Sequence, residues 1–205
     1  MNKKEKIAFI LETLESYFPH PEIPLNHFDP YTLLIAVMLS AQCTDERANQ
    51  VTPHLFKLAK TPYEMLDLEE EKIYQIIKPC GLGKNKAKAI KKMSLQLIER
   101  FHGEVPNHLE DLESLAGVGH KTASVVMIQA FQEPAFPVDT HIHRLAKRWK
   151  LSKGTTVKKT EEDLKKCFPK SKWASLHLQI IYFARKFCPA RAHKIEECPI
   201  CSRIS

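Results

Sequence analysis

Apolar residues recur at the spacing of a helix face along almost the whole chain of 205 residues. Residues 7–18 and 90–101 each carry such a stripe, and neither an alternating strand pattern nor an Asn-Gly hairpin occurs. Asp29-Pro30 has the form of an N-cap followed by proline at the first helical position, ahead of a very apolar segment ending at Gln42. The sequence therefore predicts an all-α fold. Further helices are expected after Thr44, Thr61 and Asn107 and over residues 121–131, 140–149, 158–168 and 172–187.

The chain is basic, with a net charge of +7 at pH 7. Its positive residues gather in "KNKAKAIKK" (84–92) and "HRLAKRWK" (143–150). Such clusters fit a polyanionic partner such as nucleic acid, although a solvated cationic helix face explains them equally well. Charge alone therefore leaves both readings open.

No segment of the sequence has the pattern of a membrane span. The longest apolar run, residues 31–41, is too short to cross a bilayer. Glu12 and Glu15 interrupt the basic N-terminal stretch, and no small-residue cleavage site follows it, so a signal peptide is not expected. We expect a monomeric cytoplasmic protein that binds no membrane.

Two of only six glycines, Gly117 and Gly119, flank Val118 just before a predicted helix. Glycine permits positive φ and close approach of the backbone to another surface. The unpaired amides of such a loop and of the first helical turn, with the helix dipole, form a site for a phosphate oxygen. A plain corner between two helices is the alternative. "GLGKNKA" (81–87) shares both glycines and the alanine with "GVGHKTA" (117–123), which predicts two hairpins of one type.

Several stretches together resemble one known family. "LAGVGHKTA" (115–123), "VDTHIHR" (138–144), "LLIAVMLSAQCTD" (33–45), "HGEVP" (102–106) and a C-terminal cysteine cluster are similar to the helix-hairpin-helix DNA glycosylases, most of all to the endonuclease III family. The resemblance implies a six-helix barrel-like domain over residues 22–133, with the hairpin at about 108–131. It also implies a second helical domain, residues 1–21 plus 134–205, that packs on the first and carries a metal-cluster loop at 188–201.

The implied activity is base-excision repair of double-stranded DNA with damaged bases or abasic sites. A family member of this kind is a bifunctional DNA N-glycosylase and abasic-site lyase that removes oxidised pyrimidines through a lysine Schiff base. One alternative is an adenine-specific mismatch glycosylase, which normally lacks a lysine at the position of Lys121. Another is a non-catalytic helix-hairpin-helix protein, which would need neither Lys121 nor Asp139.

Lys121 and Asp139 are the candidate catalytic residues. An attacking lysine must be a free amine near neutral pH, whereas the ordinary lysine pKa is about 10.4. Lys121 stands at the start of a helix, whose positive end disfavours the ammonium form, and we expect partial burial to act in the same direction. A fixed carboxylate such as Asp139 stabilises the positive charge that builds on the sugar as the glycosidic bond breaks. By the resemblance, Lys121 is the nucleophile and Asp139 its electrostatic and proton-transfer partner; a helix N-cap is the alternative role of Asp139.

Reaching a base inside a duplex requires flipping it out and filling the gap. The resemblance gives that role to Gln42 in "SAQCTD" and Leu82 in "GLGKNKA". Without the resemblance, Gln42 is only a polar residue at the end of a helix and Leu82 only an apolar residue in a turn. Further DNA contacts are expected from Gly117, Val118, Gly119, His120, His141, Arg191 and Lys194.

Three cysteines crowd into the C-terminal region as Cys188-x9-Cys198-x2-Cys201. The family pattern is C-x6-C-x2-C-x5-C around a [4Fe-4S] cluster, so the first spacer here is longer and the fourth cysteine, expected at about position 207, falls outside this sequence. The resemblance implies a [4Fe-4S] cluster on these three cysteines. A substitute ligand such as His193, a Cys3His zinc site, or no metal at all are the alternatives.

Overall fold

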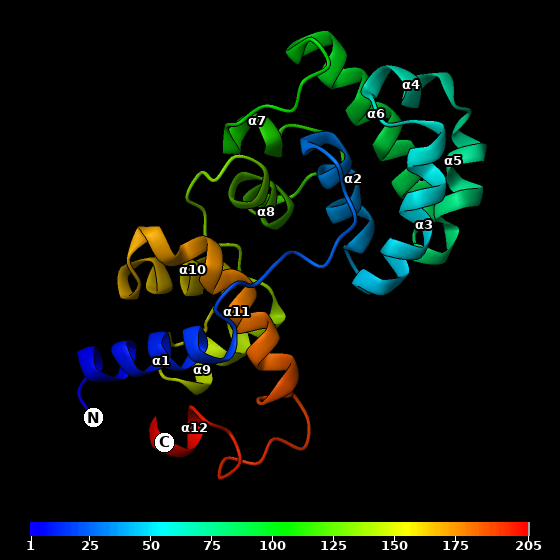
Figure 1. Ribbon diagram of the computed structural model, residues 1–205. Coiled ribbons are helices and arrows are strands. Elements are labelled where there is room, and N and C mark those ends of the chain that lie inside the picture. Colours follow the sequence, from blue (N-terminus) through cyan, green and yellow to red (C-terminus); the bar gives the residue numbers. More distant parts are fainter. Residues whose placement is uncertain (205) are drawn as a thin grey trace. The chain divides into compact units, whose positions relative to one another are not determined.

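The computed structural model describes residues 1–204, and all regular structure over that range is helical. None of the described helices is both long and apolar enough to cross a membrane. The all-α prediction is confirmed. The α-helices are α1 (Lys3–Tyr17), α2 (Pro30–Ser40), α3 (Asp45–Leu58), α4 (Pro62–Asp67), α5 (Glu70–Ile77), α6 (Gly83–Phe101), α7 (Leu109–Glu113), α8 (His120–Ala130), α9 (Thr140–Arg148), α10 (Val157–Cys167), α11 (Trp173–Lys186) and α12 (Cys201–Ile204), with 3-10 helices η1 (Lys78–Cys80) and η2 (Lys170–Lys172) (Figure 1).

The helix starts follow local capping chemistry. Asp29 caps α2 by accepting the Thr32 N–H at 2.8 Å, and Thr44 and Thr61 cap α3 and α4 in the same way. Two boundaries differ from the prediction. Helix α2 ends at Ser40, before the predicted end at Gln42, because Ala41 is extended with φ of −60° and ψ of 119° and Gln42 is left-handed with φ of 58°. The N-cap of α7 is His108 rather than Asn107.

The described chain divides into two compact units, one of which is Pro24–Glu133. Helix α2 forms its centre, buried over almost its entire length, and packs against α3, α6 and α8. Helices α4 and α5 lie against α6, and α7 lies against α8 (Figure 1). A helix that is apolar on every side belongs in a core, and α2 has this character.

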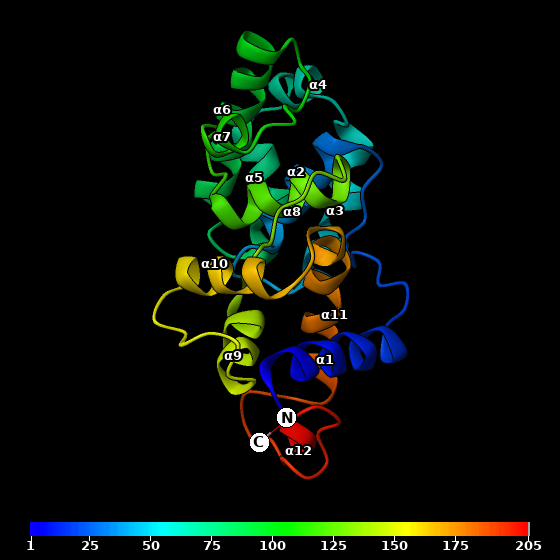
Figure 2. The same ribbon diagram turned by 90° about the vertical axis from the view of Figure 1, so that its left-hand side faces the viewer.

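The second unit joins Met1–Ile23 to the chain from Pro134 onwards. Its core is mainly aliphatic and includes the fully buried aromatic rings of Phe136, Trp149 and Phe183, and α9 and α11 pack against each other within it. Helix α12, which the sequence pattern did not predict, lies beside α1 in both views (Figures 1 and 2). The Arg203 guanidinium stands 5.5 Å from the centre of the Phe9 ring and so covers this junction.

Candidate active site and metal centre

The loop between α7 and α8 has one packed side and one open side. Gly117 has φ of +78°, and a β-carbon there would come within 2.8 Å of Met38 and 2.9 Å of Ala89. Val118 is buried, and its amide donates to the Leu115 carbonyl at 3.1 Å. Gly117 is therefore required for close packing of the loop against α2 and α6. Val118 contributes to packing, since its side chain is buried and its amide bonds to Leu115, and the predicted DNA contact of Val118 stays a prediction.

The open side belongs to Gly119 and the residues after it. Gly119 is the N-cap of α8 with φ of −95° and ψ of 171°, and a β-carbon at this position would meet no atom within 4 Å. Gly119 has no side chain to cap the helix, so the positive end of α8 is not neutralised by its N-cap residue. His120 is exposed and its Nδ1 lies 2.5 Å from the Glu113 carboxylate. The two glycines thus have different functions, which their spacing in the sequence did not distinguish.

Lys121 is the second residue of α8 and its side chain is exposed. The partial burial expected from the sequence is not found. Lys121 thus stands in the first turn of α8 with its amine in contact with solvent. The hairpin therefore presents one accessible amine directly beside the open turn at Gly119.

Asp139 is the N-cap of α9 and is half-buried. Its Oδ1 accepts the Ile142 backbone N–H at 2.8 Å, so the capping alternative raised by the sequence describes a real contact. The cap occupies one carboxylate oxygen and fixes the orientation of the group, while the negative charge stays on it. The residue belongs to the unit of residues 1–23 and 134 onwards, whereas Lys121 belongs to the unit Pro24–Glu133.

Gln42 and Leu82 share an unusual backbone. Both are exposed and left-handed, with φ of 58° and 50°. A non-glycine residue pays a steric penalty in this region, so such positions mark turns that the surrounding structure enforces. The segment around Leu82 is not a copy of the hairpin loop: Leu82 is 57% exposed where Val118 is buried, and Gly83 is already helical where Gly119 is extended. The predicted equivalence of the two hairpins is therefore wrong in detail.

Four side chains from the C-terminal region converge: Cys188, His193, Cys198 and Cys201. Their ligand atoms all lie within 4.8 Å of one another, and the Cys188 and Cys201 sulfurs are 3.8 Å apart. The three cysteines are buried. His193 Nε2 is also buried and has no hydrogen-bond partner among the described residues, which fits an atom placed to bind a metal.

Arg148 of α9 supports this centre. Its guanidinium donates to the Cys188 sulfur at 3.2 Å and to the Pro189 carbonyl at 2.8 Å. A hydrogen bond from Cys201, helped by that from Arg148, lowers the pKa of Cys188 to about 5 against the opposing effect of burial. The thiolate form, which binds metals, is thus favoured at Cys188. The sequence suggested only a basic patch around Arg148, and nothing in the pattern indicated this contact.

Comparison with known proteins identifies the family. The profile of the HhH-GPD superfamily of base excision DNA repair proteins matches residues 35–170. Endonuclease III of Bacillus subtilis is 43% identical over 203 residues, covering 97% of this chain and 91% of that protein. Endonuclease III of Escherichia coli K12 is 42% identical over 200 residues, covering 98% and 94%. The chain belongs to the endonuclease III family.

Solved structures from the endonuclease III family agree over the whole fold. A non-covalent endonuclease III–DNA complex matches with a TM-score of 0.93 at 39% identity, covering 98% of this chain and 95% of that one. A trapped covalent endonuclease III–DNA intermediate matches with a TM-score of 0.92 at 40% identity, covering 98% and 94%. The predicted family and the helix-hairpin-helix glycosylase fold are therefore confirmed.

The other basic residues predicted from the endonuclease III resemblance differ in their exposure. Arg191 and Lys194 are exposed in the loop between Cys188 and Cys198, and Lys194 pairs with Glu197 at 2.7 Å. An ion pair this exposed stabilises the protein little, so Lys194 exchanges partners easily. His141 is half-buried, and its Nδ1 lies 3.3 Å from the Arg144 guanidinium.

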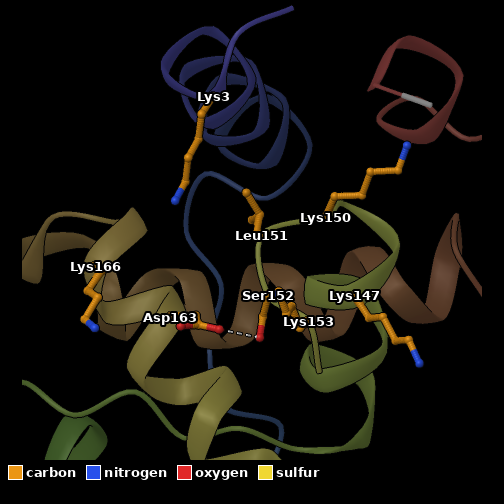
Figure 3. A pocket seen from close by; sticks show the side chains of 8 residues that line it. All are labelled: Lys3, Lys147, Lys150, Leu151, Ser152, Lys153, Asp163 and Lys166. Carbon is orange, nitrogen blue, oxygen red and sulfur yellow. Dashed lines mark hydrogen bonds between the residues drawn. The ribbon is translucent and has the colours of Figure 1, made fainter. Parts of the chain in front are cut away.

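A second basic feature is a hollow of about 500 Å3 lined by residues of α1, α9, α10 and the segment between α9 and α10. Lysines line most of it, and Asp163, which also lines it, accepts a hydrogen bond from Ser152 at 2.8 Å (Figure 3). The amines of Lys147 and Lys150 extend away from Asp163 and away from each other (Figure 3). Lys147 and Lys150 therefore do not converge on a common anion in this hollow (Figure 3). The lining residues are Lys3, Lys147, Lys150, Leu151, Ser152, Lys153, Asp163 and Lys166.

Proposed function

We propose that this protein is a bifunctional DNA N-glycosylase and abasic-site lyase that removes oxidised pyrimidines from double-stranded DNA. The observation that carries the proposal is Lys121, an exposed amine in the first turn of the hairpin helix of an endonuclease III family member. The solved covalent endonuclease III–DNA intermediate supports a nucleophilic reaction for this family. We place its action in the cytoplasm, as a monomer.

In the proposed reaction the Lys121 Nζ attacks C1′ of the damaged nucleotide. The C1′–N bond breaks, the base leaves with a proton, and the sugar ring opens to give an imine between C1′ and Nζ. Loss of a proton from C2′ then expels the 3′ phosphate by β-elimination, and water hydrolyses the imine to restore the lysine. Asp139 stabilises the positive charge on the sugar and accepts the proton that Lys121 must lose to attack.

Gln42 and Leu82 are proposed to fill the gap that the extruded nucleotide leaves. Leu82 is a largely exposed apolar residue in a strained turn, which favours a role in contact with the duplex. The open turn at Gly119 is proposed to bind a backbone phosphate through its amides, with the helix dipole adding positive charge. Arg191 and Lys194 add contacts to phosphates.

Cys188, Cys198 and Cys201 are proposed to hold a [4Fe-4S] cluster, with His193 as the fourth ligand. The convergence of the four side chains and the unpaired His193 Nε2 support this donor set. The cluster would tie the C-terminal loop to α9 through the network around Arg148. One distance favours a second candidate: sulfurs 3.8 Å apart match a single tetrahedral zinc, whose bonds to sulfur of about 2.3 Å set ligands at that separation.

Borohydride trapping on DNA with an abasic site tests the activity. Borohydride reduces an imine to a stable amine, so a Schiff-base enzyme becomes covalently attached to the DNA. We expect the wild-type protein to be trapped and Lys121→Gln to bind damaged DNA without trapping, base release or strand cleavage. An adenine-specific mismatch glycosylase lacking the lysine mechanism releases bases without being trapped, and a mere DNA-binding protein does neither. Retention of lyase activity by Lys121→Gln rejects Lys121 as the nucleophile.

A further inference from the structure

Lys86, on α6, is a buried lysine whose ammonium contacts three backbone carbonyls. Its side chain is only 9% exposed. Its Nζ donates to the carbonyls of Leu39 at 2.8 Å, Ala41 at 2.8 Å and Cys80 at 3.1 Å. An ammonium group has three N–H bonds, so these three carbonyls use all of them. Burial lowers the pKa of Lys86, with the nearby Cys80 and Cys43 thiols acting in the opposite direction.

The three carbonyls belong to two chain segments far apart in sequence. Leu39 and Ala41 are at the C-terminal end of α2, where carbonyls lack partners within the helix and the dipole is negative, so a cation is favourable. Cys80 is the last residue of η1. Lys86 therefore joins the end of one helix to the turn that precedes its own helix.

Each of these segments leads directly into one of the two strained, exposed residues. Ala41 immediately precedes Gln42, and Cys80 stands two residues before Leu82. Both Gln42 and Leu82 are left-handed, a conformation that persists only where neighbouring contacts hold it. The fixed carbonyls on the N-terminal side of each residue are contacts of that kind.

We propose that Lys86 is a positioning residue that holds Gln42 and Leu82 at a fixed separation for entry into the duplex. The inference rests on the proposed gap-filling role of those two residues. Without the ammonium, the three carbonyls lose their common donor and the two segments move independently. The two segments would then have to become ordered during base extrusion. Because that ordering costs free energy, the reaction on paired DNA becomes slower.

The same helix offers a matched control. Lys91 donates from its Nζ to the carbonyls of Leu66 at 2.8 Å and Leu68 at 2.5 Å, at the C-terminal end of α4. Like Lys86, it is a lysine of α6 that caps another helix through backbone carbonyls. Neither acceptor of Lys91 adjoins Gln42 or Leu82 in the chain. Lys91→Met therefore removes a capping ammonium from α6 without affecting the backbone next to those two residues.

The test compares Lys86→Met and Lys91→Met with the wild type on two substrates. One is an abasic site in a duplex; the other is the same site in a single strand, where no opposite base has to be displaced. Initial rates of borohydride trapping are measured on both. We expect Lys86→Met to lose about tenfold or more on the duplex and less than about threefold on the single strand, and Lys91→Met to lose little on either.

Equal losses on the two substrates, or equal losses for the two variants, overturn the positioning role. If Lys86→Met does not fold, Lys86→Arg keeps a buried cation, but its planar fork does not direct N–H bonds at the same three carbonyls. Lys86→Arg should likewise lose more of its trapping rate on the duplex than on the single strand. An equal loss on the two substrates contradicts the proposal for this variant as well. Failure of the proposed function has a separate signature, because the wild-type protein itself would then not be trapped on either substrate.

Discussion

The Asp139 carboxylate accepts the backbone N–H of Ile142 at 2.8 Å, so the residue proposed to stabilise charge on the sugar is also the N-cap of α9. Aspartate and asparagine are about equally good N-caps, because each offers a side-chain oxygen to the helix. Only the negative charge distinguishes them. The capping and the catalytic roles are therefore separable by substitution.

Asp139→Asn should keep the cap and remove the charge. We expect circular dichroism and thermal unfolding close to those of the wild type, with turnover on damaged duplex slowed by a factor on the order of a hundred or more. Asp139→Ala should show the same kinetic loss and, in addition, about 1 kcal/mol lower stability from the missing cap. Near-normal turnover in Asp139→Asn would restrict this residue to its capping role.

Gly119 offers a direct test of phosphate binding at the hairpin. The open space around it tolerates a side chain, and aspartate or asparagine at an N-cap should stabilise α8 by a few tenths of a kcal/mol relative to glycine. Gly119→Asp places a negative charge where a phosphate is proposed to bind. We expect its affinity to fall by about three- to tenfold for all duplexes alike, measured by fluorescence anisotropy.

Gly119→Asn is the control, since it has nearly the same shape and cap but no charge. Its affinity should stay much closer to that of the wild type. Gly117 is unsuitable for this purpose, because any side chain there collides with Met38 and Ala89 and disturbs folding before it meets DNA. A loss limited to one lesion or one sequence would contradict phosphate binding at Gly119.

Features set by neighbouring residues were predictable from the sequence. Asp29, Thr44 and Thr61 cap their helices as expected, because an N-cap contact joins residues only three apart. The family motifs around Lys121 were equally informative, since their order along the chain is specific. The left-handed turn at Gln42 was not expected, because nothing in a glutamine side chain favours that conformation.

Features set by distant contacts were not predictable. Lys86 belongs to a lysine-rich segment for which the sequence allowed a solvated cationic face or a DNA-facing surface, yet its ammonium is buried against carbonyls up to 47 residues away. Gly117 and Gly119 looked equivalent until the packing of Met38 and Ala89 showed which one is crowded. Residue type and spacing do not record such contacts, because they depend on how helices pack.

Asp163 gives a prediction for acid stability. Hydrogen bonds from Lys159, at 2.8 Å, and from Ser152 lower its pKa below the ordinary value of 3.8. A carboxylate with a lowered pKa in the folded protein stabilises it fully above the ordinary value, and this contribution is lost as pH falls through the lowered one. Urea unfolding of Asp163→Asn should show lower stability than the wild type at pH 6, with the difference vanishing toward pH 2. A difference independent of pH would mean that packing, not charge, accounts for the effect.

The metal centre gives the last prediction. If Cys188, Cys198 and Cys201 hold a [4Fe-4S] cluster with His193, anaerobically purified protein should be yellow-brown and contain iron and sulfide but little zinc. Because histidine binds one iron more weakly than a thiolate would, mild oxidation should release that iron and give the paramagnetic signal of a three-iron cluster. His193→Cys, which completes a four-cysteine set, should resist the loss, whereas His193→Ala should undergo it faster.

Cys198→Ser is expected to lose the metal and to loosen the C-terminal loop, which hydrogen exchange would detect as faster exchange over residues 188–201. DNA affinity should fall as well, since Arg191 and Lys194 lie in that loop. Stoichiometric zinc without colour would assign the site to the tetrahedral ion that the 3.8 Å separation of the Cys188 and Cys201 sulfurs fits. A colourless, metal-free protein with full activity and an unchanged loop would show that the four side chains have no ligand role.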